Sequence, residues 1–284
     1  MCLIAFAIDA HADCPLLVAA NRDEYLARPA AGLQRWRLDD GTEVIGGRDL
    51  REGGTWMGIT PGGRVAWLTN VRRAGLEQGA RSRGELVARW LGAASDAEGF
   101  AADIDAGDYG GFNLVVGDLR QRRWHWLSNC DPTRPHEATL ARLHLAPVPP
   151  GLHTLSNASL NTPWPKARRL AQALKQALED HARAEALLAD ALTDTRTAGD
   201  EELPRSGVPI EFERALSSPF VHMPQRGYGT RCSSVLRWGA DGRVQFDEWT
   251  HIALTPSPSH SPPLAPSFST AVHRRERLTV LQAA

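Results

Sequence analysis

The sequence lacks the features that mark several protein classes. No apolar run approaches the roughly 20 residues that a helix needs to cross a bilayer, so no membrane insertion is expected. The formal net charge is only -1, and positive and negative residues are interspersed, so no basic face for nucleic acid is expected. The apolar stretch 2–8 has no positive charge before it and is interrupted by Asp9, unlike a signal peptide. These absences predict a cytoplasmic protein that binds small molecules.

Cysteine is scarce and scattered. The four cysteines form no C-x-x-C pair and no zinc-ligand spacing with histidine, so neither a disulfide framework nor a metal site is expected. Three of them, Cys14, Cys130 and Cys232, are expected to be small buried apolar residues. The H-E-x-x-H and G-x-S-x-G motifs are absent, which argues against zincins and serine hydrolases. No cofactor is expected.

Hydrophobic periodicity predicts strands, then helices, then strands again. Serines three residues before a glutamate predict helices over 82–92 and 95–106, and Pro163 and Pro165 precede a long amphipathic helix reaching Leu178, with more helix over 187–192. The predicted strands are 3–8, 16–20, 43–45, 55–60, 65–69, 112–116, 123–127, 140–145, 153–155 and a hairpin of 232–238 with 244–249. Helices with one apolar face then cover sheets, which predicts an α+β layered architecture.

The composition changes near residue 250. Residues 256–267 are dense in Pro and Ser, and such a segment buries too little apolar surface to offset the entropy of ordering it. The sequence therefore predicts one domain over residues 1–250 and a disordered tail over residues 251–284.

Cys2 is the sharpest candidate for chemistry. Removal of Met1 by a methionine aminopeptidase would leave a cysteine whose own α-amine can accept the thiol proton, because that amine titrates near pH ~8 in reference peptides. One residue would then supply both nucleophile and base. The alternative is a cysteine that happens to follow the start codon at the edge of a strand.

Polar residues at predicted strand ends are candidates for the same site. Arg22 and Asp23 lie in the cluster 21–24, which is either a solvated turn or a group that positions the thiol and the amine. Asn70 and Asn157 either cap backbone groups or donate a side-chain amide to an oxyanion. Arg231 either forms a surface ion pair or adds positive charge to the site.

A series of motifs, in order along the chain, resembles the NRDE family, which includes the transport and Golgi organisation proteins. The motifs are Met1-Cys-Leu-Ile, Asn21-Arg-Asp-Glu24, Gly46-Gly-Arg-Asp49, Gly53-Gly-Thr-Trp56, Leu68-Thr-Asn-Val-Arg72, Ser82-Arg-Gly84, Gly111-Phe-Asn-Leu114, Leu155-Ser-Asn157, Pro163-Trp-Pro-Lys166 and Tyr228-Gly-Thr-Arg231. They extend over roughly nine-tenths of the chain, to about Trp249, and leave out the Pro/Ser segment.

The family in turn resembles N-terminal nucleophile hydrolases of the penicillin V acylase and bile salt hydrolase type. The resemblance implies an αββα fold: two antiparallel sheets flanked by helices. It implies that Cys2 is the nucleophile and that Asn70, Asn157 and Arg231 occupy matching site positions. Arg22 and Asp23 match less closely because the spacing differs, and Glu24 is an alternative for the acid.

Two functions remain open. The first is a cysteine hydrolase that cleaves a linear, non-peptide amide through a thioester. The second is a carrier of haem, lipid or acyl-CoA on the same fold, because eukaryotic relatives are linked with Golgi organisation, lipid metabolism and haem trafficking. The expected partner is a small amide, acyl or haem-like ligand.

Overall fold

The computed structural model describes residues 2–75, 79–137, 139–251 and 271–281. The strands are β1 (Cys2–Ile8), β2 (Leu16–Tyr25), β3 (Ala30–Arg37), β4 (Glu43–Asp49), β5 (Met57–Ile59), β6 (Arg64–Asn70), β7 (Phe112–Asp118), β8 (Arg123–Cys130), β9 (Thr139–Pro147), β10 (Gly151–Leu155), β11 (His222–Met223), β12 (Tyr228–Trp238), β13 (Arg243–Thr250) and β14 (Val272–Thr279). The α-helices are α1 (Gly84–Gly92), α2 (Ala97–Ala102), α3 (Pro165–Glu179), α4 (Ala184–Leu192) and α5 (Ile210–Ala215).

The strands form two antiparallel sheets. The first has the order β10-β1-β2-β12-β13-β14, with β11 paired to β12. The second follows the chain from β3 to β9 without crossing. The central strands of the first sheet therefore come from both ends of the chain, and β2 lies between β1 and β12.

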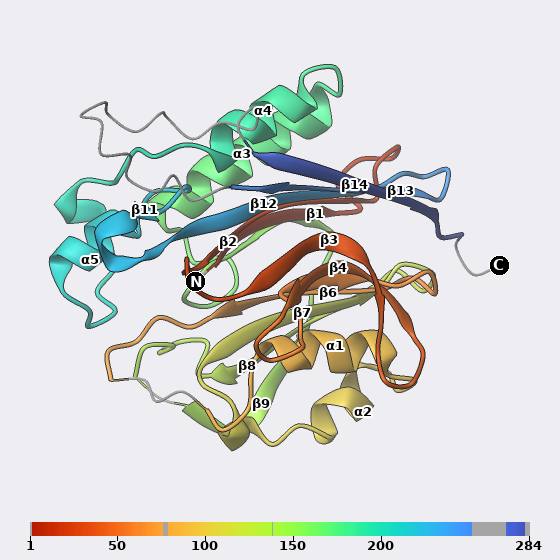
Figure 1. Cartoon of the computed structure of the whole chain (residues 1–284), viewed down its shortest axis with the longest axis horizontal. Helices are drawn as coiled ribbons and strands as arrows, with labels where there is room; N and C mark the ends of the chain where they lie inside the picture. The colour runs from red at the N-terminus through yellow and green to blue at the C-terminus, as the bar shows by residue number, and fades with distance from the viewer. Residues whose placement is uncertain (1, 76–78, 138, 252–270, 282–284) are drawn as a thin grey trace.

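The sheets stack face to face with helices on both outer sides (Figure 1). Alternate residues of β1 point to opposite faces, so Ile4, Phe6 and Ile8 enter the core between the sheets while Leu3 and Ala5 pack under α3 and α4. A third core joins the second sheet to α1 and α2. The predicted α+β fold of four αββα layers is confirmed.

Aromatic contacts tie the two sheets together. The rings of Phe6 and Trp67 meet edge to face with centroids 4.9 Å apart, and Trp67 is fully buried. Such a pair contributes about 0.5–1.5 kcal/mol beyond its buried area. This contact between β1 and β6 therefore helps to fix the relative position of the two sheets.

Several local predictions were wrong. β2 runs to Tyr25 rather than ending at Ala20, because residues 21–24 pair with β12, and residues 21–22 also with β1, instead of turning in solvent. β3 was missed because its exposed edge position favours polar residues. Ser82 caps no helix, since α1 begins at Gly84 without a side-chain cap, and Asp96 rather than Ser95 caps α2.

The predicted tail also needs correction. Residues 272–279 form β14, which pairs with all of β13, so disorder over the whole of 251–284 is wrong. Most side chains of β14 are polar and exposed, because β14 is the edge strand of its sheet. Glu276 pairs with Arg35 of β3 at 2.8 Å, and His273 stacks on Trp249. Residues 256–267, which carry the Pro/Ser composition, lie outside the described residues.

Candidate active site at the start of β1

Cys2 and Arg22 are direct partners in the antiparallel pairing of β1 with β2. Both side chains belong to the face that looks toward the second sheet, as Ile4 and Ala20 do further along the strands. Cys2 is half-buried at a cavity of about 100 Å³. The cavity is lined by Cys2, Arg22, Asp23, Glu24, Arg28, Asp49, Thr55, Trp56, Leu68, Asn70, Ser82, Arg83 and Gly84. Residues from both sheets and from the loop before α1 thus surround the thiol.

The guanidinium of Arg22 is held in place beside the thiol. It lies 4.2 Å above the Trp56 ring and 3.7 Å from Oδ2 of Asp49, and the residue is only 6% exposed. Asp49 also accepts a hydrogen bond from Nε of Arg28 at 2.7 Å. One nitrogen of Arg22, Nη1, is buried without a hydrogen-bond partner among the described residues. Arg22 thus places an unpaired N–H donor group next to the cavity.

The ionisation of Cys2 is a balance of opposing effects. Burial is the largest influence and raises the pKa of the thiol. The charge of Asp23 raises the pKa further, whereas Arg22 and a hydrogen bond with the Asp23 backbone lower it. The net pKa is raised, so the thiol needs a base next to it in order to act as a nucleophile at neutral pH.

Asn70 and Asn157 come together although 87 residues separate them. Nδ2 of Asn157 donates to both the backbone and side-chain oxygens of Asn70, each at 3.0 Å. Next to them, Oγ of Ser156 donates to the Cys2 carbonyl at 3.1 Å. Asn70 lines the cavity, whereas Asn157 is fully buried behind it. The geometry thus gives the two asparagines different positions relative to the thiol.

Asp23 and Glu24 point to opposite faces of β2 because they are adjacent in a strand. Asp23 is 1% exposed and accepts a hydrogen bond from Oγ1 of Thr230 at 2.7 Å. Burial raises the pKa of Asp23, and Lys166 is the strongest influence that lowers it. Glu24 lies nearer solvent, 3.9 Å from Nε of Arg28. Asp23 is the better candidate for a buried acid.

Arg231 is placed differently from the other predicted residues. It sits at an irregularity in the pairing of β12 with β2, where the register shifts between Thr230 and Cys232. Its Nη1 donates to the carbonyls of Tyr25 and Arg28 at 2.9 Å each. Arg231 is not among the described residues that line the Cys2 cavity, and its contacts support the backbone around it.

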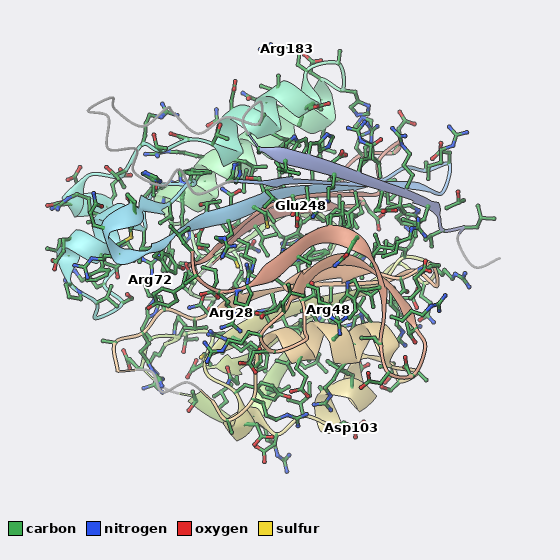
Figure 2. All side chains as sticks on the ribbon, viewed as in Figure 1. Arg28, Arg48, Arg72, Asp103, Arg183 and Glu248 are labelled. Carbon is green, nitrogen blue, oxygen red and sulfur yellow. The ribbon has the colours of Figure 1, made fainter. Side chains whose placement is uncertain are left out.

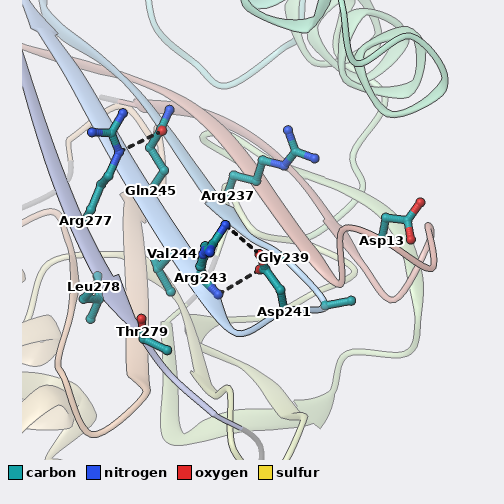
Figure 3. Close-up of a pocket in the computed structure, with 11 residues that line it drawn as sticks. Asp13, Arg237, Gly239, Asp241, Arg243, Val244, Gln245, Arg277, Leu278 and Thr279 are labelled. Atoms are coloured by element: carbon teal, nitrogen blue, oxygen red, sulfur yellow. Dashed lines mark hydrogen bonds and ion pairs between the residues drawn. The ribbon is translucent and has the colours of Figure 1, made fainter.

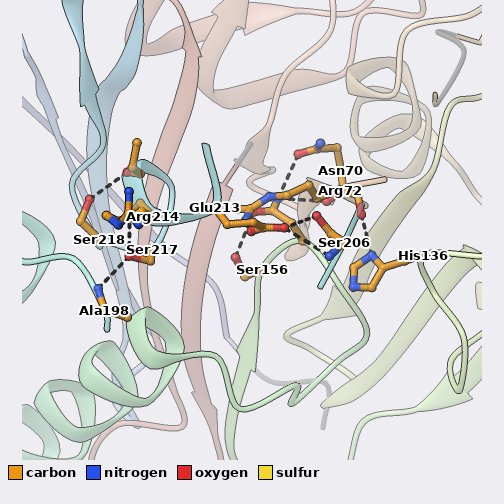
Figure 4. Close-up of polar contacts among 12 residues, drawn as sticks. Asn70, Arg72, His136, Ser156, Ala198, Ser206, Glu213, Arg214, Ser217 and Ser218 are labelled. Atoms are coloured by element: carbon orange, nitrogen blue, oxygen red, sulfur yellow. Dashed lines mark hydrogen bonds and ion pairs between the residues drawn. The ribbon is translucent and has the colours of Figure 1, made fainter. Parts of the chain in front are cut away.

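Sequence reasoning missed a buried polar cluster next to the asparagines, drawn in Figure 4. Arg72 forms an ion pair with Glu213 and donates to Oδ1 of Asn157 at 3.3 Å, and its guanidinium lies 4.9 Å from the Trp164 ring. Glu213 also accepts hydrogen bonds from Ser206. Arg72 and Arg28 both lie between the sheets at the end where β1 begins (Figure 2).

Two further basic residues were missed. Arg83 lines the cavity, donates to the Gly111 carbonyl at 3.2 Å, and has its pKa lowered by burial. Lys166, in the first turn of α3, is 1% exposed. Both residues and Arg72 fall within motifs noted in the sequence, but no spacing rule distinguished them from ordinary surface cations.

A larger hollow of about 970 Å³ lies elsewhere (Figure 3). It borders the β12–β13 hairpin and includes Arg237, Arg243 and Arg277. Because Trp238 pairs with Leu16, which pairs with Ile8, this hollow is at the opposite end of the sheet from Cys2. None of the site residues predicted from the sequence lines it.

Among residues 2–75, 79–137, 139–251 and 271–281, no three His, Cys, Asp or Glu side chains are grouped to hold a metal ion. Within these ranges, every helix is too short or too polar to cross a membrane.

Comparison with known proteins identifies the family. The family model described as Transport and Golgi organisation 2 matches residues 1–252. The chain belongs to this family. Transport and Golgi organisation protein 2 homologues from Bos taurus and Homo sapiens are 34% and 32% identical to it, covering 90% and 87% of this chain and 95% and 92% of theirs. The Drosophila melanogaster protein is 29% identical over 90% of this chain and 94% of its own. The resemblance noted in the sequence is confirmed.

Solved structures also resemble this member of the Transport and Golgi organisation 2 family. One is a Caenorhabditis elegans ortholog of N-acylethanolamine-hydrolyzing acid amidase, with a TM-score of 0.48 and 14% identity over 82% of this chain and 92% of that one. Another is a C2A mutant of the conjugated bile acid hydrolase from Clostridium perfringens, with a TM-score of 0.47 and 8% identity over 86% and 88% of the two chains.

Proposed function

We propose that the protein is an N-terminal cysteine hydrolase that cleaves a linear, non-peptide amide. The observation that carries the proposal is the grouping of Cys2, Arg22 and Asn70 around one small cavity, with Asp23 buried on the other face of the same strand end. A thiol alone supports no activity. A thiol with a fixed cation and a side-chain amide supports acyl transfer.

The proposed reaction begins with a chain from which Met1 has been removed. The free amine of Cys2 takes the thiol proton, and the sulfur attacks the amide carbonyl carbon. Asn70 and Nη1 of Arg22 donate to the oxyanion. The carbon–nitrogen bond then breaks, and the leaving amine takes the proton from the Cys2 ammonium. The product of this half-reaction is a thioester between the acyl group and Cys2.

Water completes the cycle. The Cys2 amine accepts a proton from a water molecule as its oxygen attacks the thioester carbon. The carbon–sulfur bond breaks, and the sulfur regains a proton from the ammonium, so acid and free enzyme are released. Asp23 holds the amine in position by charge, and Asn157 holds Asn70 through their hydrogen bonds.

The test combines mass spectrometry with a panel of N-acyl amides. We expect the intact mass to show loss of Met1, a transient mass increase equal to the acyl group, and release of the acid. Cys2→Ala abolishes both acyl transfer and release, whereas Cys14→Ala, at a buried cysteine of the helix-facing core, leaves them unchanged. Retention of Met1, or equal turnover by Cys2→Ala, would end the proposal.

An apolar groove favours a second candidate, a carrier of lipid, acyl-CoA or haem. A cavity of about 390 Å³ is lined by Tyr25, Phe212, Leu216, Met223, Arg226 and Tyr228. Its volume is within the range of small-molecule sites, about 300–1,000 Å³. For a carrier, haem or acyl-CoA titrates saturably, Phe212→Ala weakens binding, and Cys2→Ala has no effect. Absence of saturable binding for both ligands would exclude this candidate.

A further inference from the structure

The chain uses arginine for nearly all of its positive charge. Of its 32 Lys and Arg residues only two, Lys166 and Lys175, are lysines. Both lie in α3, in very different surroundings. Lys175 has an exposed side chain 3.9 Å from Glu179, whereas Lys166 is 1% exposed and its Nζ has no hydrogen-bond partner among the described residues. An unbonded buried ammonium is costly, so its position calls for an explanation.

Lys166 lies outside the lining of the Cys2 cavity, but it interacts electrostatically with residues of the candidate active site. The charged and titratable groups that act on it are Asp23 of β2, Cys2 of β1, Arg72 after β6 and Glu213 of α5. Arg72 and Glu213 form an ion pair with each other. Asp23 is therefore the acid left to balance Lys166, and Lys166 is the strongest influence holding the pKa of Asp23 down against burial.

Local structure does not favour a cation at this position. Lys166 is in the first turn of α3, where the helix dipole favours negative charge. Burial first, and then the charge of Arg72, lower its pKa to about 8. An arginine would stay charged at any physiological pH, but a lysine in this position can gain or lose its proton near neutrality.

Building on the hydrolase proposed above, we propose that Lys166 is a positioning residue that keeps Asp23 ionised and sets a removable positive charge beside Cys2. A nearby positive charge lowers the pKa of a thiol and of an amine alike. Lys166 therefore raises the fraction of thiolate and, in the mature chain, the fraction of unprotonated amine that can act as a base. Both effects favour attack by Cys2 at neutral pH, and both are lost when Lys166 loses its proton.

The first experiment measures alkylation of Cys2 by iodoacetamide against pH, with peptide mass to separate Cys2 from the other cysteines. Loss of the charge in Lys166→Met is expected to slow alkylation at neutral pH about ten-fold, equivalent to about one pKa unit of the thiol. Lys166→Arg keeps the charge and stays within about two-fold of the parent protein. Lys175→Met, on the same helix, is unchanged. A folded Lys166→Met protein with the parent pH profile would overturn the proposal.

The second experiment needs no change at Lys166. Protein labelled with ¹³C-lysine gives two Cε signals, which Lys175→Met assigns, and their pH titration reports each pKa. We expect Lys166 to titrate well below Lys175, and Asp23→Asn to move the Lys166 midpoint lower still, because Asp23 raises it. Two lysines with the same ordinary pKa, or no response to Asp23→Asn, would overturn the proposal. Neither experiment depends on cleavage of an amide substrate, so a failed amidase assay with these results refutes the hydrolase and leaves the role of Lys166 standing.

Discussion

The side-chain amide of Asn157 donates two hydrogen bonds to Asn70, one to the backbone oxygen and one to the side-chain oxygen. In both bonds Asn157 is the donor and Asn70 the acceptor, so the Nδ2 group of Asn70 donates nothing to Asn157. The Nδ2 of Asn70 has only a long 3.5 Å contact, to the Val71 carbonyl. The amide that remains able to donate to a ligand beside Cys2 is therefore that of Asn70, with Asn157 fixing its orientation.

Replacing the two asparagines is expected to separate these roles. Asn70→Ala lowers kcat for amide cleavage about 100-fold or more, as loss of an oxyanion donor does, with little change in KM. Asn157→Ala removes the hydrogen bonds that Asn157 makes with Asn70 and Arg72 and lowers the free energy of unfolding by about 1–3 kcal/mol. Steady-state kinetics of both variants measure kcat and KM, and urea unfolding measures their stability. Equal kinetic and stability losses for the two would contradict the assignment.

Much of the site could be predicted from the sequence because it depends on local features. Cys2 follows the initiator methionine, and Asn70 and Asn157 stand where apolar strands end, so each is visible without knowledge of the fold. What brings them together is the antiparallel packing of two sheets. The family resemblance supplied that architecture, and hydrophobic periodicity alone gave only the class α+β.

The remainder could not be predicted because it depends on contacts distant in sequence. Asp23 and Lys166 interact only because α3 packs on the outer face of β1 and β2, and a lysine in a helix ordinarily faces solvent. Glu213 was invisible for the same reason, since a short polar helix gives no sign of a buried partner. Residues 21–24 were mistaken for a turn because β12, more than 200 residues away, pairs with them.

The last strand predicts an effect of truncation. Ending the chain at His251 removes β14 together with Val280, which is 1% exposed and whose carbonyl accepts a hydrogen bond from Trp238 at 3.1 Å. Burial of one such valine contributes about 1.5–3 kcal/mol. The truncated protein is therefore expected to unfold at lower urea and to aggregate through the exposed edge of β13. Urea unfolding and light scattering measure both, and parent-like stability would show that β14 is dispensable.

His251 predicts a loss of stability in mild acid. Its ring meets that of Phe220 edge to face with centroids 4.9 Å apart, and burial lowers its pKa from 6.5 to about 4. The folded pKa is lower than the unfolded one, so the unfolded chain binds the proton more tightly. Stability is then lost as the pH falls from 6.5 to about 4.

The expected loss over that range is about 2 kcal/mol, reduced from the full linkage value because the ring is partly exposed. Urea unfolding at a series of pH values measures it. His251→Gln flattens this part of the pH dependence, whereas His222→Gln, at an exposed histidine of β11, does not. A parent protein whose stability is constant from neutral pH to mild acid would contradict the burial of a neutral His251.

The buried ion pair of Arg72 with Glu213 gives the largest expected effect on stability. Their side chains are 3% and 2% exposed, and Arg72 also binds Asn157. Glu213→Gln leaves the guanidinium buried without its counter-charge, which is expected to lower the free energy of unfolding by about 3–5 kcal/mol.

The next residue in the chain supplies the control. Arg214 pairs with Asp200 at 2.7 Å, but both side chains are exposed, so Arg214→Gln is expected to change stability by less than about 1 kcal/mol. Urea unfolding of the two variants compares neighbouring residues of one helix, and similar losses for both would mean that burial does not decide the strength of these pairs.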